Sequence, residues 1–169
     1  PAYDCYAPAV RLNGGKPIHL TMKQPDFTID WNEVEQAITP QTKAIIINTP
    51  HNPSGAILAQ KDLLRLEKIV ANKEITVVSD EVYEQIIFDS VHQSALRLNQ
   101  LRKQSAIVYS FGKTFHVTGW KCGYVIAPEQ LTAEIRKIHQ YLVFSVSTPL
   151  QYALAEYLQN AENEDISAL

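Results

Sequence analysis

The sequence predicts a three-layer α/β/α fold in which helices cover both faces of a mostly parallel β-sheet. Short runs rich in Ile and Val recur along the 169 residues without polar alternation, as in strands that are buried on both faces. Between these runs, apolar residues recur every three or four positions, which is the spacing of amphipathic helices. Buried strands that alternate with helices form parallel sheets. No repeat, low-complexity tract or linker interrupts the pattern, so we expect one unit.

Five apolar segments are predicted to form the strands. They are Ile18–Met22, Ala44–Ile47, Ile75–Val78, Ala106–Tyr109 and Tyr124–Ala127. Their β-branched and aromatic residues favour strands. We expect each of them to lie inside the sheet, with other structure covering both of its faces.

Four segments are predicted to form helices. They are Trp31–Ile38, Lys61–Val70, a segment that carries Leu131, Ile135, Ile138 and Leu142 on one face, and a final helix that begins at Thr148. Asp30 is a suitable N-cap for the first, because its side chain can accept hydrogen bonds from free backbone N–H groups. Pro149 suits the first turn of the last helix, where no backbone N–H is needed. The acidic run Ala161–Asp165 is expected to be a solvated helix end.

Composition and charge exclude several classes of protein. The formal net charge is −3 and the pI is about 6.0, so no basic surface for nucleic acid is expected. No apolar run approaches the ~20 residues that span a bilayer, and the start of the chain lacks the regions of a signal peptide. We therefore expect a cytoplasmic protein that contacts no membrane. The chain begins at Pro1 rather than Met, and we expect it to be part of a longer protein.

The cysteines and histidines give no sign of a metal site. Cys5 and Cys122 are far apart and fit no metal-binding or redox spacing, so we expect both to be reduced, buried side chains. The five histidines show no clustered ligand spacing. His51 and His116 fall in polar loops, where they are candidates for contact with a ligand. The P-loop, dinucleotide-binding and nucleophile-elbow motifs are also absent.

Polar side chains follow three successive predicted strands. Asn52 follows the first, Asp80 and Tyr83 follow the second, and Ser110 and Lys113 follow the third. Taken singly, these side chains have structural explanations: Asp80 as a helix cap, Asn52 as a turn residue and Lys113 as a surface charge. Because ligands of open α/β sheets bind at the carboxyl ends of the strands, we expect the five side chains to converge around one crevice.

The motifs around these residues resemble those of the class I and II aminotransferases, enzymes of fold type I that depend on pyridoxal phosphate (PLP). The matching stretches are N-T-P-H-N-P-S-G at 48–55, S-D-E-V-Y at 79–83 and S-F-G-K-T-F-H-V-T-G-W-K-C-G at 110–123. Within this family, A-Y-D-C-Y at 2–6 and H-Q-Y-L-V-F at 139–144 are most similar to the branch that contains methionine aminotransferases and kynurenine or glutamine transaminases. The resemblance implies that residues 1–169 are the central part of the PLP-binding large domain. The N-terminal segment and the C-terminal small domain of the family would be absent.

The resemblance implies catalytic roles for three residues. Lys113 would bind the cofactor aldehyde as an imine, which requires its amine to be deprotonated. Asp80 would keep the pyridine nitrogen protonated, so that the ring can accept electrons. Tyr83, together with Asn52, would hydrogen-bond the phenolic oxygen of the cofactor.

Further residues would hold the cofactor in place. Ser110 and Lys121 would bind its phosphate; several family members carry arginine where this chain has Lys121, so the charge is kept and the bidentate fork is lost. Tyr3 would stack on the pyridine ring. In related enzymes the bond that corresponds to Asn52-Pro53 is cis, so a cis peptide is expected there.

The activity implied by the resemblance is transfer of an amino group from an L-amino acid (methionine, aromatic or glutamine-like) to a 2-oxo acid by a ping-pong mechanism. Members of the family are usually homodimers, and a homodimer is expected for the full-length protein. The 169-residue chain alone is expected to be inactive. Two alternatives share the same residues: a PLP-dependent C–S β-lyase, and a PLP-sensing, aminotransferase-like domain of a transcriptional regulator.

Overall fold

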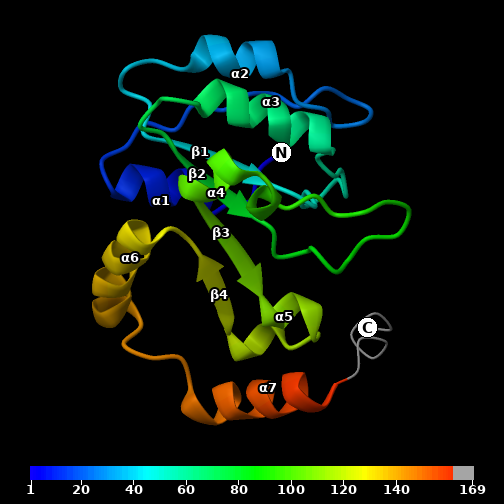
Figure 1. Cartoon of the computed structure of the whole chain (residues 1–169), viewed down its shortest axis with the longest axis vertical. Coiled ribbons are helices and arrows are strands. Elements are labelled where there is room, and N and C mark those ends of the chain that lie inside the picture. Colours follow the sequence, from blue (N-terminus) through cyan, green and yellow to red (C-terminus); the bar gives the residue numbers. More distant parts are fainter. Residues whose placement is uncertain (162–169) are drawn as a thin grey trace.

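The computed structural model describes residues 1–161, and its framework is a four-stranded β-sheet (Figure 1). The strands are β1 (Ala44–Asn48), β2 (Thr76–Asp80), β3 (Ser105–Ser110) and β4 (Gly123–Ile126), in the spatial order β1-β2-β3-β4. β1 pairs with β2 and β2 with β3 in parallel, whereas β4 runs antiparallel to β3. The predicted α/β class with a mostly parallel sheet is therefore confirmed.

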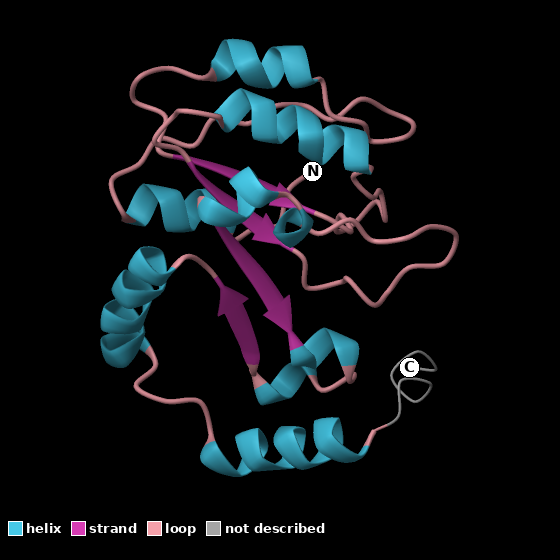
Figure 2. Cartoon of the chain, in the orientation of Figure 1, coloured by secondary structure: helices cyan, strands magenta, loops and turns pink. Residues whose placement is uncertain are grey.

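The described residues also form seven helices and two 3₁₀ turns, which lie before, between and after the strands (Figure 2). They are α1 (Tyr6–Leu12), α2 (Trp31–Ala37), α3 (Gln60–Val70), η1 (Ala95–Arg97), α4 (Asn99–Lys103), α5 (Phe111–Thr114), η2 (Thr118–Trp120), α6 (Glu129–Leu142) and α7 (Thr148–Asn160). The four predicted helices are confirmed, including the cap, because the Asp30 carboxylate accepts hydrogen bonds from the backbone N–H groups of Asn32 and Glu33. Pro149 lies in the first turn of α7, as expected. α1, α4 and α5 are too short to show a helical repeat in the sequence.

The hydrophobic core lies between the sheet and α3. Leu63, Leu66 and Val70 on α3 are buried against Val77 and Ile107 of the central strands. α2 packs on α3, and the two helices lie together at one end of the molecule (Figure 1), while α6 and α7 lie at the other end.

The two faces of the sheet carry different side chains at the carboxyl end of β2. Ser79 and Glu81 point to the face covered by η1, because Glu81 accepts a hydrogen bond from the backbone N–H of Ala95. Asp80 points to the opposite face, where it accepts a hydrogen bond from Tyr6 of α1. Helices therefore lie on both faces, which gives the predicted three layers.

Two expectations about the strands were wrong. Ile18–Met22 forms no strand, and Ile18 is 63% exposed, because no other strand of residues 1–161 lies beside this segment to complete a ladder. β4 is exposed at all four positions, although burial on both faces was expected. The helix that follows it, α6, has no buried residue within the described part of the chain, so it does not cover β4.

Some smaller expectations have different outcomes. Cys122 is buried, as predicted, but Cys5 is exposed, because α1 buries none of its side chains and Cys5 precedes its first turn. The acidic run from Glu162 to Asp165 lies outside the described residues. Within residues 1–161, no helix has the length and apolar character needed to cross a membrane, and no cluster of three potential metal ligands is found.

Candidate active site

The turn after β1 is fixed over the end of the sheet by Asn48, a residue that the sequence did not single out. Asn48 pairs in register with Asp80, and its amide N–H₂ donates to the Asp80 carbonyl at 3.0 Å. Its side-chain oxygen accepts from the backbone N–H of Asn52 at 2.8 Å. The Asn52-Pro53 peptide is cis, as predicted, and so are Thr49-Pro50 and Gln24-Pro25. The Asn52 side chain is thereby placed at the carboxyl end of β2.

Three of the predicted residues form a row at this edge of the sheet. The Asn52 amide donates to the Tyr83 hydroxyl at 3.2 Å. The Lys113 Nζ lies 5.4 Å from the centroid of the Tyr83 ring, over its face. A third link comes from Thr114, whose hydroxyl lies 3.4 Å from Glu84 Oε1 and joins α5 to the segment after β2. The predicted convergence of an amide, a phenol and an amine is therefore present.

Asp80 has a partner that sequence reasoning missed. The Tyr6 hydroxyl donates to Asp80 Oδ2, while Oδ1 accepts from the backbone N–H of Val82 at 3.3 Å. Burial raises the pKa of the Tyr6 phenol well above its usual range, and the hydrogen bond to Asp80 and the charge of that carboxylate raise it further. The available signal was the spacing of Tyr3 and Tyr6, but residues three apart share a face only if the segment is helical.

Tyr3 lies at the rim of the site, beside Tyr6. Its side chain is 50% exposed, and its ring meets that of Tyr6 edge to face, with the centroids 5.7 Å apart. Because Tyr6 contacts both Tyr3 and Asp80, its ring links Tyr3 to that carboxylate.

His51 holds the start of the chain against the turn after β1. Its Nε2 lies 3.1 Å from the carbonyl oxygen of Pro1, which can only accept, so Nε2 carries the proton. Its Nδ1 therefore accepts from the Ser54 hydroxyl at 2.6 Å, and Ser54 Oγ accepts from the backbone N–H of Ala56 at 3.2 Å. Burial lowers the pKa of His51, in agreement with a neutral ring. His51 is thus a structural contact between two segments of the site.

The pairing of β3 with β4 places Ser110 beside the strand that follows Lys121. Ser110 pairs with Gly123, two residues after Lys121, which has a left-handed backbone with φ 54°. Gly123 has no room for a side chain, since a Cβ there would lie 2.4 Å from the Tyr109 carbonyl oxygen. Without this close approach, β4 could not return beside Ser110.

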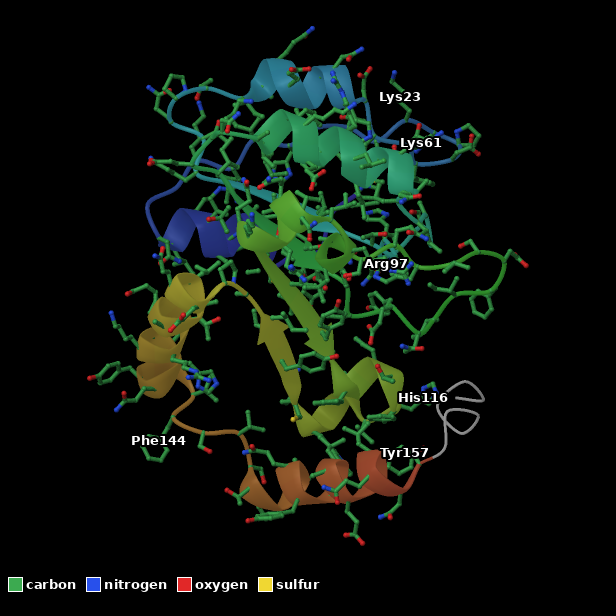
Figure 3. The ribbon with its side chains drawn as sticks, in the orientation of Figure 1. Lys23, Lys61, Arg97, His116, Phe144 and Tyr157 are labelled. Atoms are coloured by element: carbon green, nitrogen blue, oxygen red, sulfur yellow. The ribbon has the colours of Figure 1, made fainter. Side chains whose placement is uncertain are left out.

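The turns on either side of Lys113 also pack closely. A Cβ on Gly112 would lie 2.9 Å from the Cα of Thr118, and the Thr118 hydroxyl donates to the Gly112 carbonyl at 3.0 Å. Beyond α5, Figure 3 shows Tyr157 of α7, whose ring meets that of Phe115 edge to face at 5.1 Å. The loop that carries Lys113 is therefore held from two sides.

An open pocket of about 590 Å³ lies beside the row of polar side chains. Asn52 and Tyr83 line its inner side, and Ile86, Ile87 and Phe88 form an apolar wall. A small molecule with one polar end and one apolar end would suit this lining.

Comparison with known proteins agrees with this geometry. The family model "Aminotransferase class I and II" matches residues 1–168. The chain belongs to this family. Methionine aminotransferase of Escherichia coli (strain K12) is 49% identical over 170 residues, which cover 100% of this chain and 44% of that protein. Kynurenine–oxoglutarate transaminase 3 of Mus musculus is 35% identical over 167 residues, which cover 92% of this chain and 37% of that protein.

Solved structures of aminotransferases have the same fold. The crystal structure of YbdL from Escherichia coli, identified as a methionine aminotransferase, matches with a TM-score of 0.95 and 47% identity, over 99% of this chain and 44% of that one. The branch of the family predicted from the sequence is confirmed by these relatives. This chain spans less than half the length of the relatives named above.

The side chains at this edge of the sheet suit PLP, on which the family generally depends. The Asp80 carboxylate keeps acceptor capacity beyond its two hydrogen bonds, since each of its oxygens has two lone pairs. Ser110 makes no capping hydrogen bond with its hydroxyl. In residues 1–161, no carboxylate forms an ion pair with Lys113 or Lys121. A cofactor with a ring nitrogen, an aldehyde and a phosphate would meet an anion, an amine and a cation here.

Proposed function

We propose that this chain forms the cofactor-binding core of a PLP-dependent aminotransferase, which moves an amino group from an L-amino acid to a 2-oxo acid. The observation that carries the proposal is the row formed by Lys113, Tyr83 and Asn52, with Asp80 at the end of β2, the strand that Tyr83 follows. An amine is the group that binds an aldehyde covalently, and it needs neighbours that hold the rest of the ligand in register.

The polar residues around Lys113 orient the ligand in this proposal. Asp80 holds a proton on the ring nitrogen, and Tyr83 with Asn52 donates hydrogen bonds to the phenolic oxygen. A bound cofactor would supply an electron sink when the substrate loses its α-proton. Lys113 would move that proton as general base and acid, because a free amine can both accept and donate a proton.

The remaining predicted residues bind the ends of the cofactor. Ser110 offers a hydroxyl and Lys121 a positive charge to the phosphate, and the strand pairing that places them supports this role. Tyr3 covers the ring with its exposed face. Lys121 binds as a point charge without the fork of an arginine.

We propose methionine, an aromatic amino acid or a glutamine-like amino acid as the donor, with ping-pong kinetics. The 49% identity to a methionine aminotransferase favours the first of these. We further propose that the whole protein is a cytoplasmic homodimer. Because the chain spans only 44% of that relative, we expect it to turn over poorly by itself. The curated relatives are aminotransferases, and they favour neither the β-lyase nor the regulatory alternative.

The test is the visible absorption of the protein that carries this chain after addition of PLP. We expect a band that borohydride removes and that is absent from the Lys113→Ala variant, together with a loss of transamination of about 10²–10⁴-fold. Lys61→Ala, an exposed lysine on α3, is the matched control and should keep both the band and the rate. A band of equal strength in the Lys113→Ala protein would refute the proposal.

A further inference from the structure

Glu81 is a fully buried carboxylate that no part of the proposed reaction uses. It follows Asp80 directly, its residue exposure is 0%, and it points to the opposite face of the sheet. A buried anion is strongly destabilising unless it is paired and hydrogen-bonded. The neighbours of Glu81 therefore show what it does in the fold.

Four donors surround the two carboxylate oxygens. Oε1 accepts from the Ser79 hydroxyl at 2.8 Å and the Ala95 backbone N–H at 3.0 Å, and Oε2 accepts from the Tyr109 hydroxyl at 2.9 Å and His92 Nε2 at 2.9 Å. Although burial opposes ionisation, the hydrogen bonds from His92 and the other donors hold the pKa of Glu81 below its usual value. The donors come from β2, β3, η1 and the segment that leads into η1.

The protons of this network have only one consistent arrangement around Tyr109. A carboxylate only accepts, so the Tyr109 hydroxyl donates to Glu81. The Ser94 hydroxyl, 3.1 Å from the Tyr109 oxygen, must then donate to it, while Ser94 Oγ accepts from the backbone N–H of Leu96 at 3.1 Å. Such a connected chain of hydrogen bonds holds its members in fixed positions.

The network joins the two strand ends that carry the candidate active site. Glu81 lies one residue after Asp80, and its backbone N–H donates to the Val108 carbonyl at 3.0 Å. Tyr109 lies one residue before Ser110 and four residues before Lys113, which is in the short helix α5 that follows β3 directly. The hydrogen bond between Tyr109 and Glu81 therefore joins the end of β3 to the end of β2 as a clamp. It lies next in sequence to Asp80 on β2 and four residues before Lys113.

We propose that Glu81 is a positioning residue that fixes the Lys113 amine relative to Asp80 and Tyr83 by holding Tyr109. The role deepens the proposed function and rests on it. A small displacement of a reacting group is enough to lower a rate substantially, even when substrate binding is retained. Loss of the clamp should therefore act on kcat more than on KM.

The test compares Glu81→Gln with a matched control, Glu67→Gln, in the protein that carries this chain. The Gln amide keeps the shape of Glu81 but has one oxygen in place of two, so it cannot accept from all four donors. Glu67 also accepts from backbone N–H groups of another element, those of Gln100 at 3.0 Å and Leu101 at 3.4 Å, but it is only half-buried, whereas Glu81 is fully buried. Both changes remove one carboxylate that links two elements.

We expect Glu81→Gln to lower kcat at least about tenfold, with KM changed less than about twofold. Without any cofactor, amide hydrogen exchange over Phe111–Thr114 should become faster, again by about tenfold or more. Glu67→Gln should leave both measurements unchanged. If both variants merely unfold at lower temperature and keep kcat and the exchange rates, Glu81 stabilises the fold only and the proposal is overturned.

A double-mutant cycle separates positioning of Lys113 from a general effect on cofactor binding. Glu81→Gln should weaken PLP binding about tenfold when Lys113 is present and less than about twofold in the Lys113→Ala background, because only the covalent bond needs the amine in place. An equal loss in both backgrounds would overturn the proposal. Should Glu81→Gln fail to fold, Tyr109→Phe removes the same clamp while its ring can stay packed on Tyr124, 5.0 Å away.

The outcomes also separate this inference from the proposed function. If the unaltered protein shows no PLP-dependent band, the proposed function fails, and the exchange measurement still decides whether Glu81 holds the Lys113 loop. If the band is present and Glu81→Gln changes neither kcat nor exchange, the positioning role fails alone.

Discussion

Replacing Tyr6 by Phe removes the hydrogen bond that the phenol donates to Asp80, and it leaves the aromatic ring in place. A hydrogen bond to a charged group contributes roughly 1.5–3 kcal/mol. Because this one is only part-buried, we expect the free energy of unfolding at pH 8 to fall by about 1.5 kcal/mol, or the Tm by about 3–6 °C for a chain of this size. Tyr152→Phe, at a residue that is 74% exposed on α7, is the control and should change neither value.

The same pair makes a distinct prediction at alkaline pH. The pKa of Tyr6 in the folded protein is raised above the value of about 10 that an unfolded tyrosine has. The protonated phenol therefore stabilises the fold fully below about pH 10, and this stabilisation is lost as the pH rises, by about 1.4 kcal/mol per pH unit. The Tyr6→Phe variant has no phenol at this position to ionise. The difference in the free energy of unfolding between the two proteins should therefore disappear near pH 11.

The assay is urea unfolding of both proteins at pH 8, 9, 10 and 11. Tyr109 and Tyr124 also have raised pKa values, mainly because surrounding atoms partly shield their phenols from water, but they titrate in both proteins and cancel in the difference. A difference that stays constant from pH 8 to pH 11, or that is absent at pH 8, would refute the reasoning.

Two further predictions concern His51 and Gly123. His51→Gln should cost about 1 kcal/mol at pH 8, where the neutral ring bridges Ser54 and the chain start. Because burial lowers the pKa of His51, the unaltered protein loses stability as the pH falls below about 6.5. The Tm of the variant, measured by thermal unfolding, should therefore depend less on pH in this range. A Tm that depends more steeply on pH in the variant would contradict this. Gly123→Ala should destabilise by about 2–3 kcal/mol, since its Cβ would lie 2.4 Å from the Tyr109 carbonyl oxygen. Gly119→Ala, which has open space, should stay within about 0.5 kcal/mol, and equal effects at the two glycines would sink the steric argument.

Local patterns predicted most of the elements because they depend on neighbours within a turn or a few residues. The Asp30 cap and the buried face of α3 followed from spacing alone, and both are confirmed. Ile18–Met22 failed because an apolar run has the same appearance whether or not another strand lies beside it. The direction of β4 was equally hidden, since a short apolar strand can pair in either direction.

The candidate site likewise has features that the sequence predicts and features that only the tertiary structure shows. The sequence by itself determined which side chains follow each strand, and therefore that Asn52, Asp80 and Lys113 would gather at one edge of the sheet. Only the tertiary structure decided their partners: Tyr6 lies 74 positions from Asp80, and Tyr109 lies 28 positions from Glu81. The periodicity of a segment fixes which face is buried, whereas the pairing of distant side chains depends on how the packed elements bring their ends together.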